Sequence, residues 1–594
     1  MGVKESWNTR IGVILAVSGS AVGLGNFLRF PGQVAQYGGG AFMVAYFISF
    51  LIIGLPICWA EWSMGRYGGQ RGFHTTVGIL HSIVRHKIGK YLGVIGIVIP
   101  VIIYMYYVLI EAWCLGYAVN FLAGNMNFST AAEASAFFTE FTGAGGDGTG
   151  LGLNGASQVG YFLLFCFVLN FFLIYRGIAK GIELFCRYAM PALIILAMII
   201  LVRVLTLGTP DAENPDRSIS AGLGFMWNPS KTLMVTETPL ADGTVERSEV
   251  QVLGREQIRA AREAAAADAG VTIRTISMAD QMKNPDLWLA AASQIFFSLS
   301  VGFGIIMTYA SYLKKDDDVV LSGLAATSAN EFAEVALGGL ITIPASVAFL
   351  GVVGISGAIG STFALGFHVL PMVFSAMPFG AFFGFLFFFL LFLAAVTSSL
   401  SMLQPGIAFL ESAMAINRKQ SVAILGFITG IGALFVVYFS GNLKALDTMD
   451  FWVGSFLIFI LATIQIIVFS WVMGIDEGFA VAHQGAHLRI PRFFGFVMKY
   501  VSPVFLLAIF FMWVTQNLFG YNVFTGESSE SPYVRDLFGR GDAPADPVAW
   551  MSVLVILLFV AFVLVVVNSS AHFRRLTHTR VPARDPQNTM GGDL

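Results

Sequence analysis

The first hydrophobic stretch of this chain, residues 10–34, is long enough to cross a lipid bilayer, but small and polar residues interrupt it halfway. The interruption runs from Ser18 to Asn26 and contains three glycines, two serines and an asparagine. Backbone that unwinds within the hydrocarbon loses several kcal/mol for each unpaired carbonyl, so it is tolerated only where it lines a cavity. We therefore expect these carbonyls to bind a ligand, and a cation fits them best.

A second stretch of the same kind follows in the other half of the chain. It covers residues 285–313 and is interrupted between Phe297 and Gly304. Two interrupted spans at matching positions of two halves indicate the binding site of a transporter.

The composition supports a membrane protein, because 56% of the residues are hydrophobic and only 12% are charged. A net charge of −2 gives no reason to expect nucleic-acid binding. The hydrophobicity pattern predicts twelve spans: residues 10–34, 39–68, 88–122, 159–177, 182–206, 285–313, 319–352, 379–411, 420–440, 446–474, 493–517 and 548–570.

These spans predict a single transporter domain over residues 1–594 that contains an internal repeat. Repeat one covers about residues 10–206 and repeat two about 285–474, and each begins with an interrupted span. Five spans per repeat place the second repeat in the opposite orientation, and the spans within 493–570 are appended. The polar segment 230–283 is predicted to be an inserted extracellular loop with one exposed helix at 255–267.

The distribution of Lys and Arg predicts the orientation. If both termini are cytoplasmic, most basic residues outside segment 208–284 fall on the cytoplasmic side, and the short outer loops carry almost none. We expect a multi-pass protein of the cell inner (plasma) membrane.

Several motifs resemble those of the neurotransmitter:sodium symporter family, and most closely its bacterial amino-acid members of the LeuT type. They are Trp7-Asn8-Thr9-Arg10-Ile11-Gly12, Gly23-Leu24-Gly25-Asn26-Phe27-Leu28-Arg29-Phe30-Pro31, Gly38-Gly39-Gly40-Ala41-Phe42, Glu61-Trp62-Ser63-Met64-Gly65-Arg66-Tyr67, Arg176-Gly177-Ile178-Ala179-Lys180-Gly181 and Thr397-Ser398-Ser399. The resemblance covers nearly the whole chain except 209–284. It implies an all-α polytopic membrane protein with 12 transmembrane helices, a LeuT-type 5+5 inverted repeat with broken helices 1 and 6, and two appended helices.

The resemblance also implies two sodium sites made only of oxygen ligands, which suit a hard cation. Site one comprises Ala21, Asn26, Ser298 and Asn330, together with the substrate's carboxylate. Site two comprises Gly19, Val22, Ala394, Thr397 and Ser398. Independently of the resemblance, Ala394, Thr397, Ser398 and Met402 share one helix face by their spacing. The alternative for the two hydroxyls is ordinary bonding to backbone carbonyls within a membrane helix.

The substrate is expected to bring its own carboxylate. Amine carriers of this family have aspartate at the position of Gly23, and the resemblance places Tyr107 to donate to a substrate carboxylate. The residues expected to contact the substrate are Ser20, Ala21, Leu24, Gly25, Ile103, Tyr107, Phe297, Ser298, Ser300, Phe303, Ser398 and Met402. Their apolar character favours a neutral aliphatic amino acid, because burying an unpaired charge there would be prohibitive.

Glu61, Glu111 and Glu334 are acidic residues within predicted spans, where a charge is costly. Chloride-dependent relatives have serine at the position of Glu334, so we expect this carboxylate to replace chloride. Glu61 and Glu111 are interpreted as structural acceptors for backbone N–H groups of the broken helices.

Two pairs of residues are candidates for gates. Arg29 and Asp450 match the external gate pair, with a purely structural ion pair as the alternative. At the internal gate, Lys4 occupies the basic position. Ser412 stands where the family pattern has an aspartate, and Glu411 is adjacent to it.

Together these expectations describe a sodium-coupled symporter working by alternating access with two Na⁺ ions and without chloride. No nucleophile–base pair or metal cluster indicates an enzyme. The alternatives are an amine or osmolyte transporter of the same family, a non-transporting amino-acid sensor, and an ion channel. The expected partners are the amino-acid substrate and the lipid bilayer, with homodimer formation left open.

Overall fold

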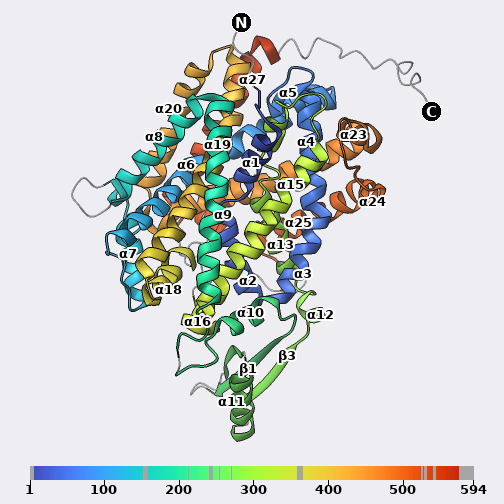
Figure 1. Ribbon diagram of the computed structural model, residues 1–594. Coiled ribbons are helices and arrows are strands. Elements are labelled where there is room, and N and C mark those ends of the chain that lie inside the picture. Colours follow the sequence, from blue (N-terminus) through green and yellow to red (C-terminus); the bar gives the residue numbers. More distant parts are fainter. Residues whose placement is uncertain are drawn as a thin grey trace.

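The computed structural model describes residues 6–151, 158–211, 213–239, 245–252, 254–268, 270–357, 365–523, 526, 531–539 and 544–573. Within these residues the protein is a bundle of long helices with one small mixed unit at one end (Figure 1).

The first repeat contains a broken helix followed by four spans. Its elements are α1 (Arg10–Ala21), η1 (Gly25–Arg29), α2 (Phe30–Tyr37), α3 (Gly40–Ser49), η2 (Phe50–Gly54), α4 (Leu55–Gly69), α5 (Thr76–Val84), α6 (Lys87–Leu122), α7 (Ala131–Thr142), η3 (Thr149–Leu151), α8 (Val159–Tyr175), η4 (Ile178–Glu183) and α9 (Leu184–Leu205).

The second repeat begins with the second broken helix. Its elements are α13 (Pro285–Leu299), α14 (Ile305–Ala310), α15 (Val319–Glu331), η5 (Phe332–Gly339), α16 (Leu340–Gly357), η6 (Leu365–Val369), α18 (Leu370–Ala376), α19 (Gly380–Met414), α20 (Arg418–Tyr438), η7 (Gly441–Leu443), α21 (Lys444–Met449), η8 (Asp450–Leu457), α22 (Ile458–Ile467), η9 (Val468–Gly474) and α23 (Ile475–Ala482). The appended part consists of α24 (Arg492–Phe496), η10 (Val497–Val501), α25 (Ser502–Asn517), α26 (Pro532–Phe538) and α27 (Pro547–Ser569).

The predicted spans agree with these helices. Within the described residues, nine helices are long and apolar enough to cross a membrane, and the bent pair formed by α1 and Gly25–Tyr37 makes a tenth. The two remaining predicted spans correspond to α8, which has 17 residues, and to the broken pair α13 and α14.

The broken helices lie in the centre of the bundle. Helix α1 contacts α9, α13, α15 and α19, and α19 also packs along α6. Both α6 and α19 are long and largely buried, and α19 contacts α1 and α14 on either side of the two breaks.

The segment between the repeats forms more than the single helix expected from the sequence. After α10 (Ile219–Trp227), strands β1 (Lys231–Pro239), β2 (Val245–Val252) and β3 (Val271–Ile276) form an antiparallel sheet in the order β2-β1-β3, followed by α12 (Met278–Gln281). Helix α11 (Gly254–Ala267) is the expected one. The strands were not predicted, because Leu233, Met234 and Val235 form a short apolar run and not the strict alternation that indicates a half-buried strand.

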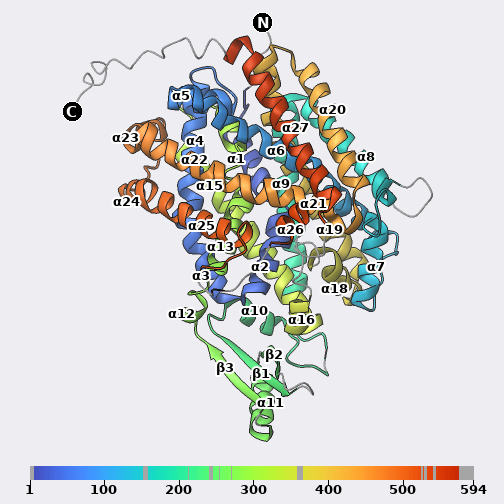
Figure 2. The same cartoon turned by 180° about the vertical axis from the view of Figure 1, so that it is seen from behind.

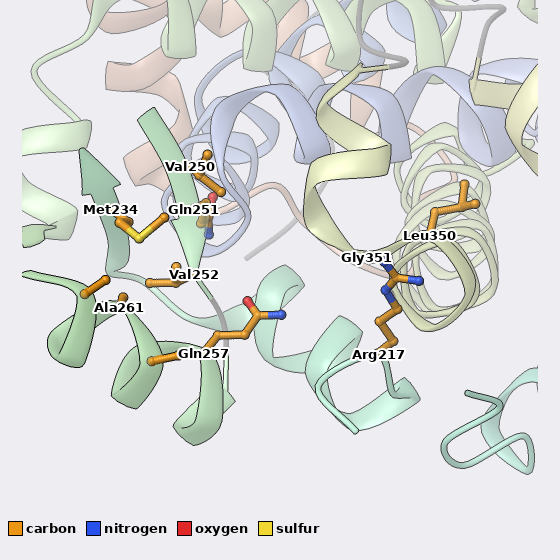
Figure 3. Close-up of a pocket in the computed structure, with 11 residues that line it drawn as sticks. Arg217, Met234, Val250, Gln251, Val252, Gln257, Ala261, Leu350 and Gly351 are labelled. Atoms are coloured by element: carbon orange, nitrogen blue, oxygen red, sulfur yellow. The ribbon is translucent and has the colours of Figure 1, made fainter. Parts of the chain in front are cut away.

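This sheet and α11 lie at the end of the molecule opposite the N-terminal end of α1 (Figures 1 and 2). A cavity of about 430 Å³ separates them from the helical bundle. Met234 and Val252 of the sheet and Ala261 of α11 line one side, while Arg217 and Leu350 line the other (Figure 3).

Candidate functional site

The first break bends the chain between α1 and η1. Helix α1 ends at Ala21, the chain bends by 46°, and helical structure resumes at Gly25. Val22 donates its amide to the carbonyl of Ser18, which satisfies one group at the helix end. The residues of the break are buried, so their carbonyls face protein rather than lipid.

The second break follows α13 and contains three residues with positive φ, at alternate positions. Ser300, Gly302 and Gly304 have φ angles of 53°, 78° and 79°. Glycine adopts this conformation without cost, whereas serine is strained there. The Ser300 hydroxyl donates to the carbonyl of Ser20 at 2.9 Å, which offsets the strain and connects the two breaks.

A cluster of buried side chains lies between the breaks and contains three residues predicted for sodium site one. Asn26 donates to the side-chain oxygen of Asn330 at 2.9 Å, and Asn330 donates to the Ser298 hydroxyl at 2.6 Å. The Ser298 hydroxyl in turn donates to Glu334. The structure therefore brings the predicted ligands from η1, α13 and α15 together.

Glu334 is the centre of this cluster. Besides Ser298, it accepts hydrogen bonds from Gln294 at 2.6 Å, from Asn330 at 3.2 Å and from Asn26 at 3.4 Å. Gln294 was not predicted from the sequence. It precedes Ser298 by four residues and so shares its helix face, which is a signal that could have identified it.

The residues predicted for sodium site two also lie together, at the contact between α1 and α19. The Ser398 hydroxyl lies 3.4 Å from the carbonyls of Gly19 and Ser20. A β-carbon added to Gly19 would lie 3.1 Å from Thr397, which shows how closely the helices approach. Thr397 donates to the carbonyl of Ala394 in its own helix, as the structural alternative expects.

Two hydroxyl groups approach Gly23 closely. A β-carbon at this position would lie 2.9 Å from the Ser398 oxygen and 3.2 Å from the Tyr107 oxygen. The Tyr107 and Ser398 hydroxyls therefore both pack against the backbone at Gly23, where a side chain would crowd them.

The other residues predicted to contact the substrate surround the same region. Leu24, Ile103, Phe303 and Met402 are buried. The Phe297 ring would lie 2.8 Å from a β-carbon at Gly25. The Ser20 hydroxyl donates to Ser401, a residue of α19 that the sequence did not single out.

Glu61 and Glu111, the other two acidic residues singled out in the predicted spans, have different partners. Glu61 accepts from Gln465 at 2.6 Å and from the backbone N–H of Gly302 in the second break at 3.3 Å, as expected. Glu111 instead accepts from the Ser399 hydroxyl at 2.5 Å and from Asn170 at 3.0 Å. The expectation that Glu111 binds backbone of a broken helix was wrong, because these side chains of α8 and α19 occupy it.

Arg29 and Asp450, the predicted external gate pair, bond to other residues in this structure. Arg29 donates to the Ser293 hydroxyl at 2.8 Å and lies 4.9 Å from the centre of the Phe297 ring. Asp450 accepts from the Tyr106 hydroxyl at 2.7 Å. Among the described residues, no ion pair connects Arg29 with Asp450.

Hydrogen bonds and an ion pair that were not predicted from the sequence hold the N-terminal end of α1 in place. Lys4 lies outside the described residues. Glu183 accepts from the amides of Asn8 at 2.8 Å and Thr9 at 3.1 Å, and also from the Thr9 hydroxyl. Arg10 forms an ion pair with Asp318 at 3.2 Å. The Trp7 indole donates to the carbonyl of Tyr309 at 3.1 Å.

Comparisons with known proteins agree with this architecture. The model of the sodium:neurotransmitter symporter family matches residues 4–141 and 264–573. An uncharacterized sodium-dependent transporter of Methanocaldococcus jannaschii is 25% identical over 86% of this chain and 90% of its own length. The sodium-dependent serotonin transporter of Drosophila melanogaster is 25% identical over 89% of this chain and 79% of its own length.

Among solved structures, the crystal structure of MhsT in complex with L-phenylalanine has a TM-score of 0.66 and 25% identity. The match covers 86% of this chain and 99% of MhsT. This similarity confirms the predicted helical membrane fold with its two broken helices.

Proposed function

This chain belongs to the sodium:neurotransmitter symporter family, and on that premise we propose that it couples Na⁺ to the uptake of neutral, aliphatic amino acids. As a member of this family it is a multi-pass, sodium-dependent membrane transporter and not an enzyme. The substrate, the number of ions and the role of chloride are parts of the proposal.

The observation that most supports the proposal is that oxygen atoms able to coordinate a cation lie together at the two breaks. Amide, hydroxyl and backbone carbonyl oxygens are hard ligands, which suit Na⁺ rather than a soft transition metal. We assign one ion to Asn26, Ser298 and Asn330 with the Ala21 carbonyl, and a second ion to Thr397 and Ser398 with the carbonyls of Gly19, Val22 and Ala394. Binding of the first ion would reorient the hydrogen bonds that now join these side chains.

The two hydroxyls that approach Gly23 support an α-amino acid as the substrate. A carboxylate placed there would reach the Tyr107 hydroxyl and complete the ligand set of the first ion. An aspartate at this position would crowd both hydroxyls. MhsT was solved with L-phenylalanine, which also carries a carboxylate. The similarity to a serotonin transporter keeps an amine as the second candidate, but Gly23 offers no partner for a substrate that lacks a carboxylate.

The side-chain region favours an aliphatic substrate because the surrounding residues are mostly apolar. Leu24, Ile103 and Phe303 offer no charge to pair with a Lys, Asp or Glu side chain. One methylene group changes affinity by about 1–3 kcal/mol, so leucine, isoleucine, valine and methionine should compete with one another.

Glu334 supports independence from chloride. Its carboxylate lies among the ligands of the first proposed ion and provides a fixed negative charge there. A chloride ion at this place would be repelled.

The contacts at the two ends of the first broken helix, which consists of α1 and η1, support alternating access. Arg29 and Asp450 bond to different partners and not to each other. At the other end, Trp7 and Thr9 form hydrogen bonds and Arg10 forms an ion pair with neighbouring elements. We assign this arrangement to a state that is closed at the N-terminal end of α1 and open at the end where Arg29 lies. In the proposed orientation, the fastened end faces the cytoplasm of the inner membrane.

Uptake into proteoliposomes tests the proposal. A sodium gradient should drive accumulation of labelled leucine, and unlabelled isoleucine, valine and methionine should inhibit it. Glutamate, lysine and serotonin should not. Binding of leucine without accumulation would favour a sensor, and inhibition by serotonin alone would favour an amine transporter.

A further inference from the structure

A groove on the outer surface of the bundle lies between α8, η4, α9 and α19. Its volume is about 430 Å³. Most of its walls are apolar side chains, and these include Leu173, Leu184, Phe185, Tyr188, Ala192 and Phe389. Leu184 and Tyr188 are exposed on a helix that spans the membrane, so the groove opens toward lipid.

Two basic side chains, Arg176 and Lys180, lie at one end of this groove. Both residues are exposed, and Arg176 lies 5.6 Å from the centre of the Phe172 ring. In the part of the chain that the structure describes, neither forms an ion pair with an acidic side chain. The groove therefore combines apolar walls with positive charge that no ion pair compensates.

The acidic residues of α8, η4 and α9 do not neutralise this charge. Helices α8 and α9 contain no Asp or Glu. In η4 the acidic residue is Glu183, which is buried and bonded to Asn8 and Thr9 of the first segment. Arg187, exposed on the following turn of α9, adds another positive charge.

The dimensions of the groove suit an acyl chain. From Lys180 to Ala192 the helical rise amounts to roughly 18 Å. One leaflet contributes about 15 Å of hydrocarbon to a bilayer. A chain that begins at the basic end would therefore cover the apolar part down to the middle of the membrane.

We propose that this groove binds an anionic phospholipid, with the phosphate between Arg176 and Lys180 and one acyl chain along α9. Basic residues at a membrane surface attract anionic headgroups, and a neighbouring apolar channel selects a lipid over a soluble anion. The site lies next to the residue that binds the N-terminal end of α1, because Glu183 follows Lys180 by three residues in η4.

Lipid retention by the full chain tests the proposal. The protein in neutral detergent is mixed with phosphatidylglycerol or phosphatidylcholine, and bound lipid is counted by native mass spectrometry. Wild-type protein should retain phosphatidylglycerol preferentially. The double variant Arg176→Gln/Lys180→Gln should bind it about 30-fold more weakly, since two surface cations are removed. The matched control Arg85→Gln/Lys87→Gln removes two other basic residues and should bind like the wild type.

A second variant separates a lipid site from a site for free anions. Ala192→Phe leaves both cations in place and fills the apolar groove, so it should also weaken retention, and inorganic phosphate should not displace the lipid. Equal retention of both lipids, or equal loss in both double variants, would overturn the proposal. So would displacement by phosphate together with unchanged binding by Ala192→Phe. Because lipid is counted directly, these results do not depend on whether the protein transports amino acids.

Discussion

The Ser300 hydroxyl donates to the carbonyl of Ser20 at 2.9 Å and thereby joins the break after α13 to the end of α1. Ser300 has a positive φ of 53°, which is unfavourable for serine. The hydrogen bond and the backbone strain thus act at the same residue, at the centre of the proposed binding site.

Substituting Ser300 separates these two effects. Ser300→Ala should destabilise the protein by about 1 kcal/mol, because it loses the hydrogen bond and keeps the strain. Ser300→Gly also loses the bond but accepts the positive φ, so it should be less destabilised by roughly 0.5–1 kcal/mol. Thermal unfolding in detergent measures both. Equal midpoints for the two variants would show that the strain contributes nothing.

Chloride should be dispensable for transport, because Glu334 provides a negative charge beside the proposed ion. Replacing chloride with gluconate should leave uptake unchanged in the wild type. In Glu334→Ser, uptake should fall in gluconate and recover when chloride is added. A wild type that stops transporting in gluconate contradicts this assignment.

Glu183 should hold the first turn of α1 closed. In Glu183→Gln, hydrogen exchange of a peptide covering Asn8 and Thr9 should accelerate, because the carboxylate that accepts both amides is lost. Asp318→Asn serves as the control for the neighbouring Arg10 contact and should affect these amides less. Unchanged exchange in Glu183→Gln would show that Trp7 and Arg10 suffice to hold this end.

The sheet and α11 should be removable without loss of uptake. Lys231 and Ile276 are paired across β1 and β3, so a short Gly-Ser linker can replace residues 232–275. Uptake by this variant should stay within about twofold of the wild type, since the segment lies outside the helical repeats. Lost uptake at normal membrane expression would assign the segment a role in transport.

The sequence predicts most of the helical architecture because long apolar spans and their breaks are local signals. It does not predict which contacts form in one particular state. The pairing of Arg29 with Ser293 rather than Asp450 depends on the relative position of η1, α13 and η8, which no local pattern encodes.

Contacts between distant segments explain the other omissions. Glu183 meets Thr9 across 174 residues, and Ser20 meets Ser401 across 381. Gln294 was readable from local spacing, because it lies four residues before Ser298, whereas Met234 interrupts any alternation of apolar and polar residues in β1. The sheet could not be derived from β1 alone, because its order depends on pairing with β3 beyond α11.

The most direct test of a shared sodium and substrate site is equilibrium binding of labelled leucine in sodium or choline buffer. One ion is proposed to share the substrate's carboxylate, so each ligand must raise the affinity of the other by the same factor. Leucine should bind tightly in sodium and weakly in choline. Thr397→Ala/Ser398→Ala should weaken the sodium dependence, whereas Thr429→Ala, a buried threonine of α20, should not. Undiminished leucine binding in choline would contradict the account.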